Sequence, residues 1–192
     1  MSSLFPNSEM RNYYTLMGEI SCESIAPVIE WIHYQNSCEA KFDQLHLLIT
    51  SDGGDVAPAM ALIDAILGSN IPITTWGLGS IYSAGFFIFL AGDERIVTPR
   101  TSLMCHTFWS ASEGTYHDHR NIAAENERFH QRLINMIVDR TSINARIAKS
   151  RLVGLSDAWV SPDEALQMKI CTQVLPGVDY STFVSIDEAS SI

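Results

Sequence analysis

The chain has 192 residues, 46% of them apolar, and a formal net charge of −10 from 22 acidic and 12 basic side chains. This length and apolar content are enough to bury one substantial core, so we predict one domain rather than two. Because the charge balance is acidic, the chain offers phosphate backbones little positive field. Nucleic acid is therefore excluded as an expected partner.

The first seven residues contain no basic region followed by an apolar one, so we expect no secretory signal and a cytoplasmic location. The longest strongly apolar run, 84–91, is less than half of the roughly 20 residues that a membrane-spanning helix needs. No association with a membrane is expected.

Four cysteines are scattered along the chain without a C-x-x-C pair: Cys22, Cys38, Cys105 and Cys171. Such spacing favours reduced thiols over a disulfide framework. No structural metal site follows from them, and we expect no cofactor.

Short β-like runs alternate with helical ones, which predicts an α/β layered domain. The expected strands are 13–17, 45–50, 73–78, 95–97 and 102–105. The expected helices are 24–34, 56–67, 84–90, about 119–140, and one around 143–152. A last helix is signalled by Ser161-Pro162-Asp163-Glu164, where Ser161 can cap the helix and Glu164 can complete a capping box.

No internal repeat and no linker-like stretch interrupts the chain between Tyr13 and Pro176. Beyond Pro176 the sequence becomes polar and acidic, as mobile chain ends often are. We therefore predict a short N-terminal segment over 1–12, one domain over 13–178, and a mobile tail over 179–192.

Ser83 follows a predicted strand and precedes an apolar helix, in Gly79-Ser80-Ile81-Tyr82-Ser83-Ala84-Gly85. Its hydroxyl would then lie at a helix N-terminus, where unpaired backbone N–H groups could hold the oxyanion of an acyl group. The competing interpretation is that Ser83 only caps the helix. The pair Gly53-Gly54, also at a strand end, could turn N–H groups toward a ligand or simply form a tight turn.

His106 follows the predicted strand 102–105, so it could lie at the same strand-end rim as Ser83. Imidazole is the usual proton acceptor for a serine nucleophile. A histidine in this position is otherwise a surface or packing residue, and we assign that role to His33, His46 and His130.

An acid must orient such a histidine, and Asp157 is the best choice because apolar and small residues surround it in Leu155-Ser156-Asp157-Ala158-Trp159. We place it in a loop just before the helix that begins at Pro162. Its alternative role is to cap a turn. Asp118 and Asp139 remain competitors on spacing alone.

Two further chemistries are open but weaker. Cys105 could be a thiol nucleophile, although adjacent residues on a strand point to opposite faces, so it could not easily share a proton with His106. His117 and His119 could bind a metal from one face of a strand, but no third ligand is near, and solvated side chains are the better interpretation. The order Ser, His, Asp also argues against an α/β-hydrolase.

Four segments, in order and at near-family spacing, make the chain resemble the proteolytic subunit of the Clp protease over about 13–176. The segment 48–54 (LITSDGG) resembles the family's strand and glycine loop, and 79–86 (GSIYSAGF) its nucleophile segment. The segment 102–106 (SLMCH) resembles the strand that carries the family histidine, and 157–165 (DAWVSPDEA) the stretch that begins with the family aspartate.

The resemblance implies a serine endopeptidase with Ser83, His106 and Asp157 as its catalytic triad and the backbone N–H groups of Gly54 and Ala84 as its oxyanion hole. It also implies a ClpP/crotonase-like superhelix of ββα units with a protruding handle helix at about 119–140. Family members assemble as heptameric rings stacked into a tetradecamer, which implies a homo-oligomer that encloses its sites. They receive unfolded polypeptide from an AAA+ unfoldase and alone cleave mainly short peptides.

The sequence departs from the family pattern at Asp52, Ala84 and Ser156. These departures motivate an alternative, a catalytically impaired or regulatory ring subunit that assembles with another chain of the family. A crotonase-type acyl-CoA enzyme of the same fold is a further alternative, and the intact order Ser83, His106, Asp157 argues against it.

Overall fold

The computed structural model describes residues 11–37 and 42–185. The strands are β1 (Tyr13–Met17), β2 (Leu45–Ser51), β3 (Ile73–Tyr82), β4 (Glu94–Val97), β5 (Ser102–Cys105), β6 (Ala158–Val160) and β7 (Gln173–Val174). The helices are α1 (Cys22–Ser37), α2 (Val56–Leu67), α3 (Ala84–Ala91), α4 (Tyr116–Arg140), α5 (Ala145–Ile147), which continues as a π-helical turn (Ala148–Leu152), and α6 (Pro162–Gln167), with a 3-10 turn at Tyr180–Thr182.

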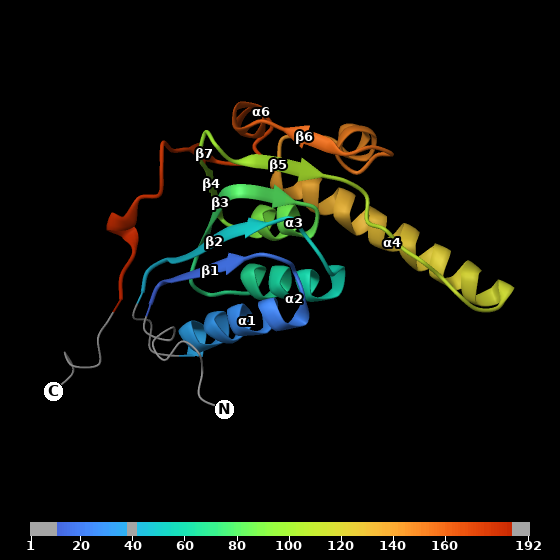
Figure 1. Ribbon diagram of the computed structural model, residues 1–192, viewed down its shortest axis with the longest axis horizontal. Helices are drawn as coiled ribbons and strands as arrows, with labels where there is room; N and C mark the ends of the chain where they lie inside the picture. Colours follow the sequence, from blue (N-terminus) through green and yellow to red (C-terminus); the bar gives the residue numbers. More distant parts are fainter. Residues whose placement is uncertain (1–10, 38–41, 186–192) are drawn as a thin grey trace.

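The strands form one mostly parallel sheet in the order β1-β2-β3-β4-β7, and β5 and β6 extend it beside the second half of β3 (Figure 1). Strand β3 has two partners in succession. Residues 74–77 pair with β4, and residues 80–82 pair with β5. The pair β5–β6 is antiparallel. One long strand therefore carries two different neighbours, and its second half leads directly into Ser83.

The expected α/β alternation is confirmed, with differences at the ends of elements. Strand β3 continues to Tyr82 instead of ending at residue 78, because Gly79 adopts a positive φ of 64° and lets the strand go on to pair with β5. The short strands β6 and β7 were not predicted, since two or three residues carry no readable periodicity.

Helix α4 begins at Tyr116, three positions before the expected start, because Thr115 and Asp118 form a capping box. Its buried residues, Leu133, Ile134 and Ile137, all lie in its second half. The first half projects from the body of the molecule beside the extended segment that follows β5 (Figure 1).

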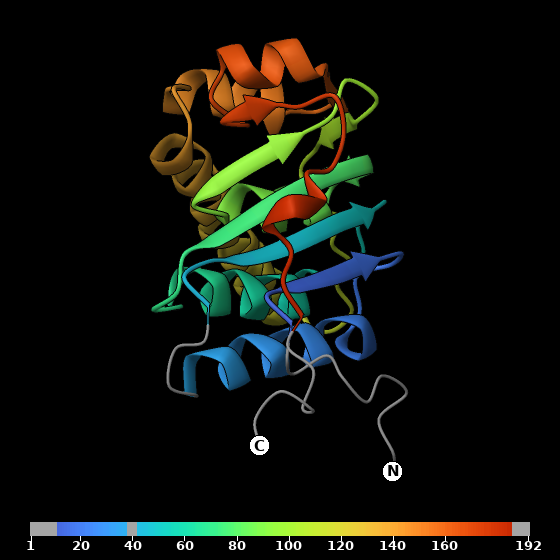
Figure 2. The ribbon, with the colours of Figure 1, turned by 90° about the vertical axis from the view of Figure 1, so that its left-hand side faces the viewer.

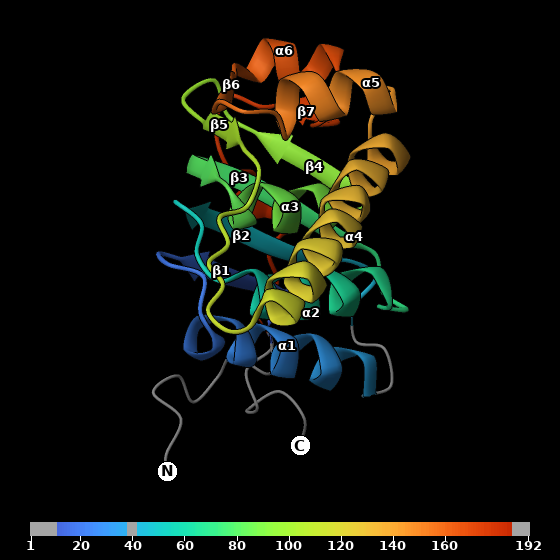
Figure 3. The same ribbon diagram turned by 90° about the vertical axis from the view of Figure 1, so that its right-hand side faces the viewer.

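Two layers cover the two faces of the sheet. Helices α1, α2, α3 and α4 lie over one face, and the main apolar core is between them and the strands (Figure 3). A second, smaller cluster of Leu48, Trp76 and Ile96 lies on the opposite face. The C-terminal segment crosses that face (Figure 2).

Of the tail that was expected to be mobile from 179 onward, the structure describes residues 179–185. They contain the 3-10 turn at Tyr180–Thr182 and a bridge between Arg11 and Ser185. Aromatic packing of Phe183, which polar composition does not reveal, fixes this segment. Residues 186–192 lie outside the described residues, as do 1–10 of the expected N-terminal segment.

No helix in the described ranges is long and apolar enough to cross a membrane. Within the same ranges, Cys22 is an exposed free thiol, and Cys105 and Cys171 are buried free thiols. Burial raises the pKa of Cys171 to about 11. Cys38 lies outside the described residues.

The buried side chain of Arg95 joins the start of β4 to the C-terminal ends of α3, α4 and α6. Its guanidinium donates to the carbonyl oxygens of Gly92, Ile170, Arg140 and Lys169 at 2.8 to 3.1 Å. Only 6% of Arg95 is exposed, so these carbonyls have little access to water.

Replacing Arg95 by Ala should lower the free energy of unfolding by about 3 kcal/mol, because it leaves several buried carbonyls without a donor. Chemical denaturation followed by circular dichroism measures the change. Arg100→Ala is the matched control, since its one described bond, to the Pro176 carbonyl, is exposed. Equal stability of the two variants would contradict this role of Arg95.

Candidate active site

Ser83 occupies a strained turn between β3 and α3. Its backbone has φ 53° and ψ −120°, which is uncommon for a residue with a side chain and costs about 1 to 3 kcal/mol. The backbone N–H donates to the Met104 carbonyl at 3.0 Å, which ties the turn to β5. The side chain makes no cap hydrogen bond to α3, so the simple helix-cap interpretation of Ser83 is wrong.

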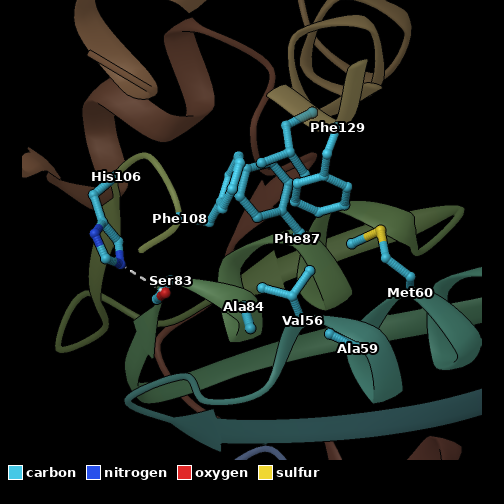
Figure 4. A pocket seen from close by; sticks show the side chains of 10 residues that line it. Val56, Ala59, Met60, Ser83, Ala84, Phe87, His106, Phe108 and Phe129 are labelled. Carbon is cyan, nitrogen blue, oxygen red and sulfur yellow. Dashed lines mark hydrogen bonds between the residues drawn. The ribbon is translucent and has the colours of Figure 1, made fainter. Parts of the chain in front are cut away.

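His106 lies directly after β5, next to the strand that leads into Ser83. The register pairs Tyr82 with Met104, so the segments that follow β3 and β5 leave the sheet at the same edge. Nε2 of His106 and Oγ of Ser83 are hydrogen-bonded at 2.7 Å (Figure 4). The two residues that the sequence placed at one rim are therefore brought into direct contact.

The glycine loop after β2, Gly53-Gly54, packs against the Ser83 turn. Gly53 has φ +103°, and a Cβ built on it would lie 2.6 Å from Cβ of Ser83. Gly54 has φ +145°, and a Cβ there would overlap the carbonyl of Ile20. Only residues without a side chain allow this close approach, so the glycine pair does more than form a tight turn.

Two backbone N–H groups near Ser83 have no acceptor among the hydrogen bonds described for 11–37 and 42–185. One belongs to Ala84, the first residue of α3, where no intrahelical acceptor exists. The other belongs to Gly54, whose neighbours Gly53 and Asp55 have their N–H groups bonded to Ser51 and Ile20. Both N–H groups are free to bind an anionic oxygen.

Asp157 lies opposite His106 in the strand register, although the structure does not join their side chains. The antiparallel pairing ends at Cys105 and Ala158, and continuing its register by one residue would put His106 and Asp157 across from each other. Asp157 is exposed, and within the described residues no hydrogen bond or ion pair links it to His106. It directly precedes the unpredicted strand β6 instead of α6.

The competing acids lie elsewhere. The carboxylate of Asp118 is engaged by Thr115 in the capping box of α4, which lowers its pKa. Asp139 lines a different hollow with Arg95, Arg140 and Lys169. Asp157 is therefore the one of the three that the register brings beside His106.

The structure disfavours the two other chemistries considered from the sequence, a thiol nucleophile at Cys105 and a metal site at His117 and His119. Cys105 is fully buried, and this burial raises the pKa of its thiol far above the ordinary value, which disfavours the nucleophilic thiolate. His117 and His119 lie in the first turn of α4 and not on a strand, so they do not share a strand face. Nδ1 of His119 is hydrogen-bonded to the Ser112 hydroxyl at 2.8 Å.

An apolar pocket opens beside the Ser83–His106 pair (Figure 4). Apart from Ser83 and His106, its lining is apolar: Val56, Ala59, Met60, Ala84, Phe87, Phe108, Phe129 and Leu133. Phe108 and Phe129 pack edge to face at 4.8 Å and form one wall.

Sequence reasoning did not find this pocket. Its lining comes from α2, α3, α4 and the segment after β5, and no local pattern shows that these elements meet. The only signal was the apolar stripe of α4 that includes Phe129 and Leu133, which predicted a partner surface without identifying it.

Comparison with known families matches the Clp protease model to residues 9–177. The chain belongs to the Clp protease family. The fold that the resemblance implied, of the ClpP/crotonase type, is thereby confirmed. The match spans both segments that build the Ser83–His106 pair.

Curated relatives are similar at low identity. The ATP-dependent Clp protease proteolytic subunit 2 of Treponema pallidum is 24% identical over 83% of this chain and 80% of its own length. The subunit 2 of Treponema denticola is also 24% identical, over 83% of this chain and 79% of its own. The proteolytic subunit of Pleurastrum terricola is 25% identical over 66% of this chain and 65% of its own length.

Replacing Gly53 by Ala should slow the reaction of Ser83 with a fluorophosphonate probe by about a hundredfold. The new Cβ must displace the Ser83 turn, and a shift of about 1 Å at a reacting group has such an effect. Gly177→Ala is the control, because a Cβ there meets no atom within 4 Å. Equal labelling rates in both variants would refute the supporting role of Gly53.

Proposed function

We propose that the protein is a serine endopeptidase that hydrolyses peptide bonds of unfolded polypeptides and short peptides. The observation that carries the proposal is the 2.7 Å contact between Oγ of Ser83 and Nε2 of His106 at a strained turn beside two free N–H groups. Membership of the Clp protease family supports it.

In the proposed mechanism, Oγ of Ser83 attacks the scissile carbonyl while Nε2 of His106 takes the hydroxyl proton. The oxyanion of the tetrahedral intermediate accepts hydrogen bonds from the N–H groups of Gly54 and Ala84. The C–N bond then breaks, and the amine leaves with the proton from His106. Water, activated by the same imidazole, attacks the acyl-enzyme and releases the acid and free Ser83.

Asp157 is proposed to orient His106 by accepting from Nδ1–H. The register that puts the two residues across from each other supports this role. The exposed carboxylate of Asp157 would reach the ring by changing its side-chain rotamer, without any change in the sheet.

The pocket next to Ser83 is proposed to hold the side chain that precedes the scissile bond. Because its walls are Val56, Met60 and phenylalanine rings, it suits leucine, methionine or phenylalanine better than a charged residue. The proposal thus includes a cleavage preference as well as a reaction class.

Clp proteases form oligomeric rings, and we propose that this chain does so as a homo-oligomer of two stacked heptamers. The projecting first half of α4 is the proposed contact between rings. A cytoplasmic location and delivery of unfolded polypeptide by an AAA+ unfoldase belong to the same proposal.

Ser83→Ala should lower peptide hydrolysis on the order of a millionfold and abolish fluorophosphonate labelling, because it removes the nucleophile. Ser80→Ala, on the same strand, is the matched control and should keep both. His106→Ala should also abolish labelling. Near-native hydrolysis by Ser83→Ala would show that Ser83 is not the nucleophile.

The missing contact between Asp157 and His106 favours one alternative, a catalytically impaired ring subunit. Fluorophosphonate labelling distinguishes an active peptidase from this impaired subunit. A wild-type chain that forms rings in mass photometry and leaves Ser83 unlabelled would be such a subunit. In an active enzyme, Asp157→Asn should lower turnover about ten-thousandfold while leaving ring formation intact.

Val56→Phe should narrow the pocket and lower the kcat/KM ratio between leucine and alanine peptides by about tenfold, the usual scale of discrimination by an apolar pocket. The alanine peptide is the internal control, since its side chain does not need the filled space. The measurement is steady-state hydrolysis of two peptides that differ only before the scissile bond. An unchanged ratio would place the recognition pocket elsewhere.

A further inference from the structure

The face of the sheet opposite α2 and α3 is crossed by the segment Tyr180–Ser185, which we call the C-terminal clasp (Figure 2). The smaller apolar cluster lies beneath it, with Trp76 almost fully buried. None of the proposed catalytic residues lies on this face. The clasp therefore needs an explanation separate from peptide hydrolysis.

Phe183 is the aromatic anchor of the clasp. Its ring stacks on Tyr13 at 5.1 Å between centroids, lies 5.1 Å from the His46 ring, and meets Trp76 edge to face at 6.1 Å. Tyr180 packs on it from within the clasp at 5.6 Å. Rings from three strands thus surround one side chain of the clasp.

Asn12 forms hydrogen bonds that attach the clasp to the body of the domain. Its backbone N–H donates to the Val184 carbonyl at 3.1 Å, and its side-chain oxygen accepts from the Val184 N–H at 2.7 Å. Its side-chain amide donates to the Thr182 carbonyl at 3.0 Å, and its own carbonyl accepts from the His46 N–H at 2.7 Å. The clasp is therefore attached at the residue that also holds His46.

His46 lies under the clasp with only 4% of its surface exposed. Nε1–H of Trp76 donates to Nδ1 of His46 at 3.3 Å. Indole is a donor only, so Nδ1 must be an acceptor and the imidazole must be neutral. Burial lowers the pKa of His46 below its ordinary value.

The described groups that face His46 provide no negative charge to stabilise a protonated imidazole. Strand β1 contributes Tyr13, over which the guanidinium of Arg11 lies at 5.4 Å from the ring centre. Strand β3 contributes Thr74 and Trp76, and the clasp contributes Phe183 and the Tyr180 ring that packs on it. At the start of the clasp, the exposed Asp179 carboxylate accepts from Ser181. Among the described residues, no carboxylate forms an ion pair with His46.

We propose that the C-terminal clasp is a pH-sensitive cover, which neutral His46 holds closed and protonated His46 releases, uncovering the aromatic face of the sheet. A proton on Nδ1 would remove the acceptor of the Trp76 N–H and place a charge under Phe183. Release lets water reach the imidazole. This inference does not depend on the proposed peptidase activity.

The direction of the pH dependence follows from linkage. When the clasp is open, His46 is hydrated and titrates near the ordinary value of about 6.5, and when it is closed the pKa is lower. Closure is therefore fully favoured above about pH 6.5. It weakens as the pH falls below that value, because only the open form binds the proton.

Hydrogen exchange of the Asn12 and Val184 amides in the full chain tests the proposal, because both amides are bonded only when the clasp is closed. After correction for the intrinsic rate, their protection should fall by up to about thirtyfold between pH 7.5 and 5.0. In His46→Gln, which cannot titrate, the fall should be less than about threefold. His130→Gln is the control and should keep the full response.

Phe183→Ala should leave both amides weakly protected at either pH, because the anchor is gone. If His46→Gln does not fold, an NMR titration of His46 in the wild-type chain replaces it, and the midpoint must coincide with the loss of Val184 protection. Wild-type protection that changes less than twofold across this pH range would overturn the proposal. An equal fall in His46→Gln would do the same.

Discussion

The parallel pairing of β5 with the second half of β3 is the interaction on which the site depends. It brings together two segments that are separate in sequence, and the Ser83 N–H continues the ladder by donating to the Met104 carbonyl. This pairing brings His106 to Ser83, and their side chains are hydrogen-bonded. Gly53 completes the arrangement, because its bare backbone fits under the turn and opposes a shift of Ser83 toward β2.

The same sheet explains why the third member of the site is less firmly held. Strand β6 has only three residues and pairs with β5 alone, so it fixes the position of Asp157 but not its side chain. The exposed Trp159, which packs edge to face on Tyr82, is the main side-chain contact between this strand and β3. The residues proposed as nucleophile and base are thus positioned by the centre of the sheet, and the proposed acid by its margin.

Sequence patterns predicted the elements whose own periodicity or capping is strong, such as α2, β1 and the start of α6 at Ser161. They also predicted that Ser83 and His106 share an edge, because parallel strands end on one side of a sheet. They could not predict the pocket or the place of Phe183, since both depend on contacts between distant elements. They also could not predict whether the Asp157 side chain contacts His106. A strand register fixes the backbone and leaves an exposed side chain free to adopt several rotamers.

The attachment of the clasp to Asn12 joins residues 172 positions apart. Closing so long a loop costs more chain entropy than any local contact in the fold, so the attachment forms after the sheet and its helices. During synthesis the ribosome releases Val184 only after all the strands and helices have emerged. A nascent chain therefore keeps the rings of His46 and Trp76 bare until Val184 has emerged, and in that interval this surface is open to chaperones or to association with another unfinished chain.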